Sequence, residues 1–146
     1  MKNFKVFSPA ERLSDLQKDV LADFLVKELG EFGDQKKDVV SCLEYAMTSE
    51  KGPGGLVITA GEFPLLEAAL VVNHTGMAGY IPEHILVYFA VSENLRGKGL
   101  GQEMMKFLLG KLPGGIALHV EPNNPAIHLY EKLGFTNKYL EMRLSR

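Results

Sequence analysis

Residues 85–109 constrain the fold of this 146-residue chain more than any other part of its sequence. They open with the seven-residue apolar run ILVYFAV, which is rich in β-branched and aromatic residues and too short for a helix of a globular protein. A polar turn over residues 92–95 and the glycine-rich segment RGKGLG follow, and apolar residues then recur at helical spacing from Leu100 onward. The sequence therefore predicts a buried strand, a glycine loop and a helix in immediate succession.

A glycine loop between a strand and a helix is suited to binding an anion. Glycine lets the backbone approach a ligand closely, and the first N–H groups of a helix have no partner within it. The helix dipole contributes roughly 0.3–1 kcal/mol for a nearby negative charge. Arg96 and Lys98 add charged donors. We therefore interpret the loop as a binding site for a diphosphate.

The glycine spacing excludes two common phosphate-binding motifs. A P-loop requires G-x-x-x-x-G-K-[ST] and a dinucleotide fold requires G-x-G-x-x-G, and Gly97, Gly99 and Gly101 fit neither. The pattern [Q/R]-x-x-G-x-[G/A] does fit, with Arg96, Gly99 and Gly101 at its fixed positions. This resembles the acetyl-CoA-binding motif of the GNAT superfamily of N-acetyltransferases. For these six residues alone, a basic turn that opens an ordinary amphipathic helix is the alternative interpretation.

A second block downstream carries the same resemblance. The run IALHV over residues 116–120 predicts a strand, and a further segment, residues 123–135, follows it. That segment resembles the other GNAT signature, N-x-x-A-x-x-L-Y-x-K-x-G-F. The matching residues are Asn123, Ala126, Leu129, Tyr130, Lys132, Gly134 and Phe135. Two motifs in the family's order are more specific than either alone, and the resemblance is close over residues 85–135.

Composition and charge are consistent with a single GNAT-type domain over residues 1–146. The net charge is −2 and the pI about 6.1, so no overall field favours nucleic acid or an anionic membrane as a partner. The longest apolar run is too short to span a membrane, and the N-terminus lacks the apolar core of a signal peptide. With one cysteine, Cys42, and no metal-ligand spacing, we expect a cytoplasmic protein without a metal site.

The whole chain predicts an α/β fold in the order β-α-α-β-β-β-α-β-α-β. In the GNAT-like arrangement this gives a mixed, mostly antiparallel central sheet flanked by about four helices. The predicted elements are strand 3–7, helices 8–29 and 34–47, strands 56–60, 65–73 and 85–91, helix 100–112, strand 116–120, helix 124–133 and strand 139–144. Ser8 and Glu11 have capping-box spacing for the first helix, and Asp34 is a candidate cap for the second. Only eleven residues follow Phe135, which leaves little room for the family's last two strands.

The resemblance implies transfer of an acetyl group from acetyl-CoA to a primary amine, by direct attack through a tetrahedral intermediate. Such an enzyme holds thioester and amine together, stabilises the oxyanion, removes a proton from the ammonium and returns one to the thiolate. The residues that the resemblance assigns to the cofactor are Phe89, Ala90 and Val91 on the central strand, Arg96, Gly97, Lys98, Gly99, Leu100 and Gly101 in the loop, and Asn123.

The same resemblance places Tyr130 where the family carries its general acid. The alternative is an amphipathic helix residue whose ring lies in the core. Glu83 and His84 lie at the start of the central strand, where many relatives carry a base, but they could equally be solvated residues at a strand entry. His119 and Glu121 could line the same cleft, so we leave the base unassigned.

Two functions remain open at this point. The first is an acetyl-CoA-dependent N-acetyltransferase acting on a small-molecule amine or a peptide or protein amine. The alternative is a non-catalytic CoA- or acyl-CoA-binding module of the same fold, which the intact motif residues disfavour. Substrate choice in the family lies in the first two helices and in the loop over residues 75–82, which carry no recognisable signature. An exposed edge at residues 139–144 would need covering, so a homodimer through this edge or the adjacent helix is a further hypothesis.

Overall fold

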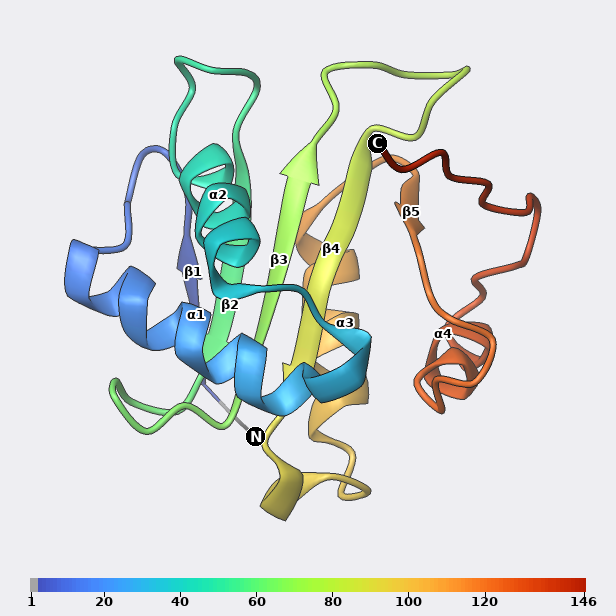
Figure 1. Ribbon diagram of the computed structural model, residues 1–146. Helices are drawn as coiled ribbons and strands as arrows, with labels where there is room; N and C mark the ends of the chain where they lie inside the picture. Colours follow the sequence, from blue (N-terminus) through green and yellow to red (C-terminus); the bar gives the residue numbers. More distant parts are fainter. Residues whose placement is uncertain (1–2) are drawn as a thin grey trace.

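One five-stranded sheet forms the middle layer of the protein, with helices on both of its faces (Figure 1). The computed structural model describes residues 3–146. In chain order its elements are β1 (Phe4–Phe7), α1 (Asp15–Leu29), the 3-10 turn η1 (Gly30–Phe32), α2 (Lys36–Ala46), β2 (Gly55–Ala60), β3 (Ala68–His74), β4 (His84–Val91), the 3-10 turn η2 (Glu93–Leu95), α3 (Leu100–Lys111), β5 (Ile116–Leu118) and α4 (Ile127–Lys132). Helices α1 and α2 cover one face, α3 covers the other, and α4 lies on the β5 side of the sheet (Figure 1).

The strands follow the spatial order β1-β2-β3-β4-β5, so each one pairs with its neighbour in the sequence. The first four are antiparallel, whereas β5 runs parallel to β4. A parallel pair needs a crossover connection, and α3 supplies it on the face opposite α1 and α2. The predicted mixed, mostly antiparallel sheet with four flanking helices is confirmed.

Two hydrophobic clusters, one on each face of the sheet, join the layers. Strand β2 is buried along its whole length because it has neighbours on both faces. The largest fully buried helical side chains are Leu21, Leu25, Leu43, Met104, Met105 and Leu108. Each such side chain stabilises the fold by roughly 1.5–3 kcal/mol. This packing closes the middle of the sheet, so a ligand has to bind at strand ends, at loops or on the β5 side.

Strand β4 contains one extra residue, Val87, at the point where its register with β3 shifts. Val71 pairs with Tyr88 and Val72 pairs with Leu86, so Val87 has no partner on β3. A bulge of this kind bends a strand and interrupts regular pairing. Strand β5 pairs with β4 only as far as Leu86, the residue before the bulge. Beyond this point β4 and β5 separate.

Helix α1 begins six residues later than the capping-box spacing of Ser8 and Glu11 predicts. The N-cap is Ser14, which forms a complete capping box with Gln17. Ser8 and Glu11 instead exchange two backbone hydrogen bonds of 3.1 and 3.0 Å, which fold the chain into a turn after β1. The prediction of a helix start at Ser8 is therefore wrong, because a second capping sequence lies immediately before the helix and satisfies the same backbone groups.

The candidate cap of the second helix has a different task. The N-cap of α2 is Gln35, which makes no side-chain capping bond. The Asp34 carboxylate instead accepts a 2.6 Å hydrogen bond from the Tyr88 hydroxyl. Burial and this bond raise the pKa of Tyr88 well above its usual range. The contact ties the start of α2 to β4.

The C-terminal segment, residues 139–144, does not form the predicted strand. None of residues 136–146 pairs with the sheet, and Tyr139, Leu140, Met142 and Leu144 are 76–90% exposed. Strand β5 is only three residues long, so its outer edge offers few backbone groups for a further strand. Figure 1 shows this segment running from α4 back towards the start of β4, outside β5. None of the helices within residues 3–146 is both long and apolar enough to cross a membrane.

Candidate active site

The loop between β4 and α3 presents a row of unpaired backbone donors. Gly97 and Gly99 have φ angles of +76° and +88°, in the left-handed region that favours glycine, and Gly99 is the N-cap of α3. Within residues 3–146, none of the N–H groups of residues 97–102 donates a hydrogen bond to the protein. The helical bonds start with Glu103, whose N–H donates to the Gly99 carbonyl. Free N–H groups at a helix N-terminus attract anions, so the loop carries the donors that a diphosphate requires.

Gly101 is a glycine for a different reason. A Cβ atom at this position would lie 3.0 Å from the Phe89 ring and 3.4 Å from the Val91 side chain. The missing side chain lets the first turn of α3 pack directly on β4. The donors of the loop therefore lie next to the unpaired part of that strand.

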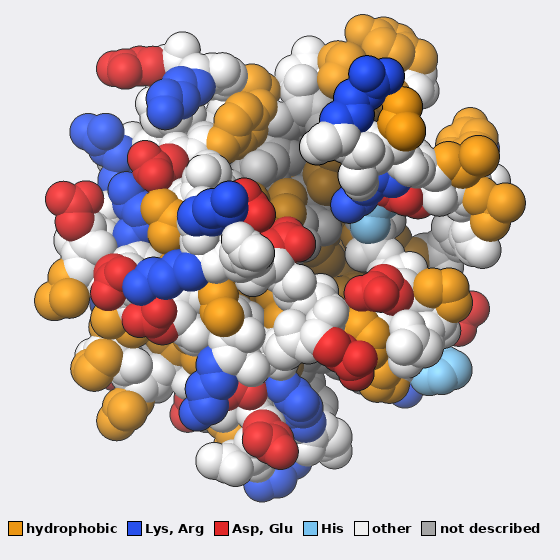
Figure 2. Space-filling model, viewed as in Figure 1, with side chains coloured by type: hydrophobic (Ala, Val, Ile, Leu, Met, Phe, Trp, Pro, Cys, Tyr) orange, Lys and Arg blue, Asp and Glu red, His pale blue; other side chains and the backbone are white. Residues whose placement is uncertain are grey.

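The part of β4 that follows the bulge has a free edge on the β5 side. Pairing with β5 is confined to His84–Leu86, so the backbone from Val87 to Val91 has no strand partner on this side. Phe89 and Val91 pack against the α3 cluster, whereas Ala90 packs on the α1 and α2 side. Figure 2 shows a recess in the surface just right of its centre. The recess lies between the part of the protein that contains α1 and α2 and the part on the β5 side. An extended chain could bind to the free edge there by backbone hydrogen bonds.

Tyr130 lies on α4 beside this edge. Its ring centroid is 6.3 Å from that of Phe89 and 5.8 Å from that of Phe135, and the residue is 8% exposed. Burial raises the pKa of the Tyr130 phenol to about 12. Its hydroxyl makes no hydrogen bond to any residue within 3–146. The structure thus brings the predicted general acid against the predicted cofactor strand, with a protonated hydroxyl that no protein group occupies.

Asn123 lies in the turn that precedes α4. It is exposed, and its side chain has no hydrogen-bond partner among residues 3–146. Its neighbour Asn124 instead shapes the turn, because the Asn124 carboxamide oxygen accepts a 3.0 Å hydrogen bond from the Ala126 N–H. The Asn123 amide is therefore available to a ligand.

Arg96 is turned towards the protein rather than away from it. Its Nε donates to the Val91 carbonyl oxygen at 3.0 Å, and one terminal nitrogen donates to the Glu28 carbonyl oxygen at 2.8 Å. The same nitrogen lies 3.2 Å from the Glu28 carboxylate. Lys98, in contrast, is exposed and forms no ion pair with residues 3–146. Of the two expected cationic donors, only Lys98 is free of protein partners.

Glu83 and His84 lie together at the other end of β4. Both pack towards the turn before β5, where a Cβ atom on Gly114 would collide with the Glu83 carboxylate. The His84 Nε2 lies 2.8 Å from the Pro113 carbonyl oxygen. Strands rise about 3.3 Å per residue, so His84 and Phe89 are roughly 16 Å apart along β4. These two base candidates are thus remote from the ring of Tyr130.

The His84 ring also bonds to a histidine on the neighbouring strand. The two Nδ1 atoms of His74 and His84 are 2.9 Å apart. Because the Pro113 carbonyl can only accept, His84 Nε2 donates to it, and Nδ1 is the atom that faces His74. Burial, followed by the nearby His84, lowers the pKa of His74. Both nitrogens of the His84 ring are therefore occupied by protein groups.

The remaining polar candidates lie outside this contact network. His119 and Glu121 are exposed in the segment after β5, and their side chains have no hydrogen-bond or ion-pair partner among residues 3–146. His128 faces Glu131 at 3.8 Å on the surface of α4. Burial raises the pKa of Cys42 to about 11, so this thiol is protonated at neutral pH and acts as a packing residue.

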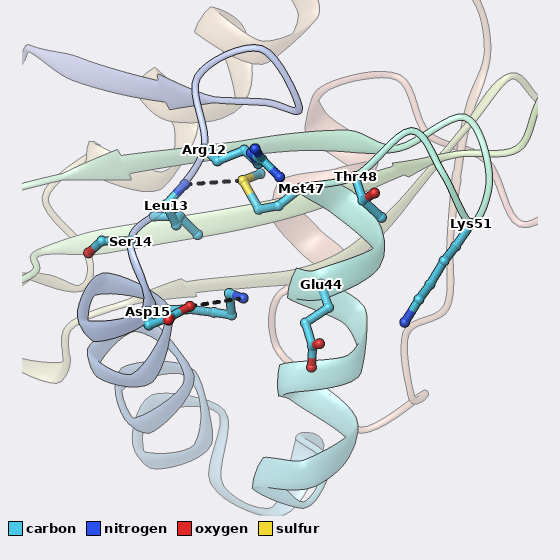
Figure 3. A pocket seen from close by; sticks show the side chains of 9 residues that line it. Arg12, Leu13, Ser14, Asp15, Glu44, Met47, Thr48 and Lys51 are labelled. Carbon is cyan, nitrogen blue, oxygen red and sulfur yellow. Dashed lines mark hydrogen bonds and ion pairs between the residues drawn. The ribbon is translucent and has the colours of Figure 1, made fainter.

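A separate hollow of about 450 Å³ lies where α1 begins and α2 ends (Figure 3). Its lining residues are Arg12, Leu13, Ser14, Asp15, Lys18, Glu44, Met47, Thr48 and Lys51. The Leu13 N–H donates to the Met47 sulfur at 3.4 Å, and the Ser14 hydroxyl is occupied as the cap of α1. Charges of both signs surround the hollow and none of the motif residues reaches it. The β4–α3 region therefore remains the candidate active site.

Two residues of the candidate site were missed by the sequence interpretation. Val87 sits inside an uninterrupted apolar run, so no local signal marks it as the bulge that separates β4 from β5. Glu28 lies near the end of an amphipathic helix and looks like one of many solvated carboxylates. Only its distance to Arg96 in space reveals its connection with the loop.

Residues 66–135, which contain the loop, β5 and Tyr130, match the family model described as Acetyltransferase (GNAT) family. This model match and this fold are those of acyltransferases of the N-acetyltransferase type. Residues 66–135 thus carry a GNAT acetyltransferase segment, on a fold that the chain shares with solved GNAT structures. No curated protein sequence matches it significantly.

Solved structures with the same fold cover nearly the whole chain. The ribosomal-protein-S18-alanine N-acetyltransferase from Escherichia coli is 19% identical, with a TM-score of 0.69 over 94% of this chain and 80% of that one. An aminoglycoside acetyltransferase from an uncultured soil metagenomic sample is 18% identical, with a TM-score of 0.67 over 100% and 99% of the two chains. The aminoglycoside N-acetyltransferase AAC(6')-Iy, solved in complex with CoA, is 10% identical, with a TM-score of 0.67 over 100% and 96%.

Proposed function

We propose that this protein transfers an acetyl group from acetyl-CoA to a primary amine. The observation that carries the proposal is the row of unpaired N–H groups at residues 97–102, next to the free edge of β4. These groups suit the two parts of the cofactor. Backbone N–H groups and the Lys98 ammonium would bind the diphosphate, and the backbone of β4 would bind the amides of the pantetheine arm. Asn123 offers a further amide from the turn before α4. Acetyl-CoA supplies the acetyl group as an activated thioester.

The chain's own residues then have a short list of tasks. The loop and the edge from Val87 to Val91 hold the donor in one orientation, which lowers the entropic cost of bringing thioester and amine together. Free backbone N–H groups on the same edge stabilise the negative charge that develops on the carbonyl oxygen. Tyr130 donates a proton to the departing thiolate, because its hydroxyl is protonated at neutral pH and has no protein partner.

The proton of the attacking ammonium is removed by water in this proposal. Glu83 and His84 remain candidates for the base, but the ring of His84 is occupied on both nitrogens and lies roughly 16 Å along β4 from Phe89. A water chain through the hollow beside β4 needs no such side chain. The acceptor is a small-molecule amine or a peptide or protein amine, and the proposed setting is the cytoplasm.

The proposal is tested by titrating the purified protein with CoA and by measuring thiol release from acetyl-CoA with a panel of amines. We expect saturable binding of CoA, and thiol release that depends on one class of amine. Binding without turnover across the whole panel would favour the second function, a non-catalytic CoA- or acyl-CoA-binding module. Absence of CoA binding would contradict both.

We also propose that the protein pairs as a homodimer through its C-terminal segment. Four exposed apolar side chains lie within residues 139–144, and β5 has a free edge. Exposed edges and apolar patches of this kind are usually covered in soluble proteins. Light scattering of the full chain and of a chain ending at Lys138 tests the idea. We expect a dimer and a monomer respectively, and a monomeric full chain at high micromolar concentration would contradict it.

A further inference from the structure

We propose that Glu28 is a positioning residue for the cofactor loop and that it acts through Arg96. The inference rests on the proposed function, because it concerns how the loop is prepared for CoA. Glu28 lies on α1, far from the glycine loop in sequence and outside both family motifs. Its carboxylate nevertheless contacts the two residues that begin and end the turn before that loop.

The contacts form a clamp with three anchor points. One Glu28 carboxylate oxygen accepts from the Glu93 N–H at 3.0 Å and from the Arg96 guanidinium at 3.2 Å. The Glu28 carbonyl oxygen accepts from the same guanidinium at 2.8 Å. The Arg96 Nε closes the clamp on the Val91 carbonyl oxygen at 3.0 Å. The end of β4, the turn η2 and the end of α1 are thus held by one pair of side chains.

The clamp is built around a buried charge. The Glu28 side chain is 7% exposed, whereas that of Arg96 is 51% exposed. A carboxylate that has lost its water needs charged or N–H partners, and here it has both. Removing either partner would leave a buried group unpaired, so Arg96 is not free to leave Glu28 for a ligand.

The position of the clamp explains what it does for the cofactor. Arg96 is followed directly by Gly97, and Gly97 and Gly99 both adopt positive φ angles. Glycines are the most flexible residues of the backbone, so the direction of the N–H groups at residues 97–102 depends on how the segment is anchored before them. Holding Arg96 prepares this donor row before the ligand arrives, which reduces the ordering cost of binding. The charge of Arg96 is neutralised by Glu28, so the attraction for the diphosphate comes from the N–H groups and Lys98.

Calorimetric titration of Glu28→Gln with CoA distinguishes this role from a direct contact. If Arg96 acts through the clamp, Glu28→Gln weakens CoA binding by about tenfold, because the loop loses its anchor. If Arg96 instead bound the diphosphate itself, removing its competing carboxylate would leave CoA binding unchanged or tighter. That second result would overturn the inference.

The donor used in the activity assay separates positioning from general damage. S-acetylpantetheine has the thioester and the pantetheine arm but no diphosphate. We expect Glu28→Gln to lower kcat/KM with acetyl-CoA about tenfold and to leave kcat/KM with S-acetylpantetheine nearly unchanged. An equal loss with both donors would mean a merely structural role. Glu31→Gln, which removes an exposed carboxylate from the following turn η1, is the matched control and is expected to behave as wild type.

A second variant keeps the test decisive if Glu28→Gln does not fold. Arg96→Lys retains the positive charge but not the forked donors that reach Val91 and Glu28 together. We expect it to weaken CoA binding as Glu28→Gln does, and the double variant to be no weaker than either single one. Undiminished binding by Arg96→Lys, or additive losses, would overturn the clamp. Failure of the wild type to bind CoA would instead overturn the proposed function on which the clamp rests.

Discussion

The two ends of β4 differ in how their polar groups are satisfied. At the His84 end, both ring nitrogens of His84 have partners, one on β3 and one in the turn before β5. At the Val91 end, the N–H groups of residues 97–102 have no partner among residues 3–146. Unpaired polar groups are costly when buried and useful when a ligand can reach them. The difference therefore separates a closed structural junction from an open candidate binding site on one strand.

The largest effect is expected at the open end, for Tyr130→Phe. Only the hydroxyl is lost, and this group has no hydrogen bond within residues 3–146, so stability and CoA affinity should hardly change. If Tyr130 donates the proton, kcat should fall by roughly 10²–10⁴ with an equal fall in kcat/KM. Steady-state kinetics and thermal unfolding check both parts.

The packing of Tyr130 shows which result of Tyr130→Phe would contradict its role as the proton donor. Its ring contacts Phe89 and Phe135, so a large loss of melting temperature would assign it to the core. A loss of kcat of less than about tenfold would mean that water or another donor serves the thiolate. The pKa of about 12 also predicts that Tyr130 causes no alkaline loss of activity near pH 10.

The next effect concerns the donor row itself, through Gly99→Val. A β-branched residue at a φ of +88° is strongly disfavoured, so the start of α3 has to change its backbone angles. Losing two charge-assisted hydrogen bonds costs roughly 3 kcal/mol, or about a hundredfold in CoA affinity. Calorimetric titration measures the loss.

Gly110→Ala is the matched control for that substitution. Gly110 lies near the other end of α3, has an ordinary helical φ, and a Cβ atom there has open space. Replacing a helical glycine by alanine should stabilise the protein by up to about 1 kcal/mol and leave CoA affinity unchanged. Equal CoA affinity for Gly99→Val and Gly110→Ala would remove the loop from the binding site.

At the closed end, His84→Leu should cost stability rather than activity. The substitution leaves the Pro113 carbonyl and the His74 ring without their partner, which costs about 2 kcal/mol. A chain of this size should then melt roughly 4–8 °C lower. A variant with wild-type stability and severely reduced turnover would show instead that His84 is the catalytic base.

The smallest effect is the pH dependence at the same junction. The pKa of His74 is lower in the folded protein than its ordinary value of 6.5. Well above pH 6.5 the group is neutral in both states and has no influence on stability. Below this pH the unfolded chain binds the proton more readily than the folded protein. The free energy of unfolding therefore decreases as the pH is lowered, until His74 is protonated in the folded state too. A His74→Gln variant, measured by denaturant unfolding between about pH 5 and 7.5, should lack this component.

Much of the site follows from short-range patterns in the sequence. The strand over residues 85–91, the glycine loop and α3 are contiguous, so their order already places an anion site at a helix N-terminus. Tyr130 and Gly134 lie within one motif, and Gly134 ends α4 as a residue with positive φ. Patterns of this kind depend on neighbours in the chain, which a sequence displays directly.

The features that escaped prediction depend on contacts across the fold. Ser8 and Ser14 both precede plausible capping partners, and only the course of the chain after β1 decides between them. The segment 139–144 has strand composition, but the edge that would receive it is three residues long. Arg96 carries a charge suited to phosphate, yet a carboxylate from α1 reaches it first. Local preference was outweighed in each case by an arrangement in three dimensions.

The bulge at Val87 also has a consequence for engineering. Leu86 and Phe89 both pack with the α3 cluster, so removing Val87 alone would restore ordinary alternation without moving either side chain to the other face. The shortened strand could then continue its ladder with the chain beyond Leu118. We expect such a deletion to close the gap between β4 and β5 with additional hydrogen bonds. The variant would then be more stable but would lack the space for a ligand beside β4. If the proposed function holds, this one irregular residue marks a point at which the domain gives up stability for ligand binding.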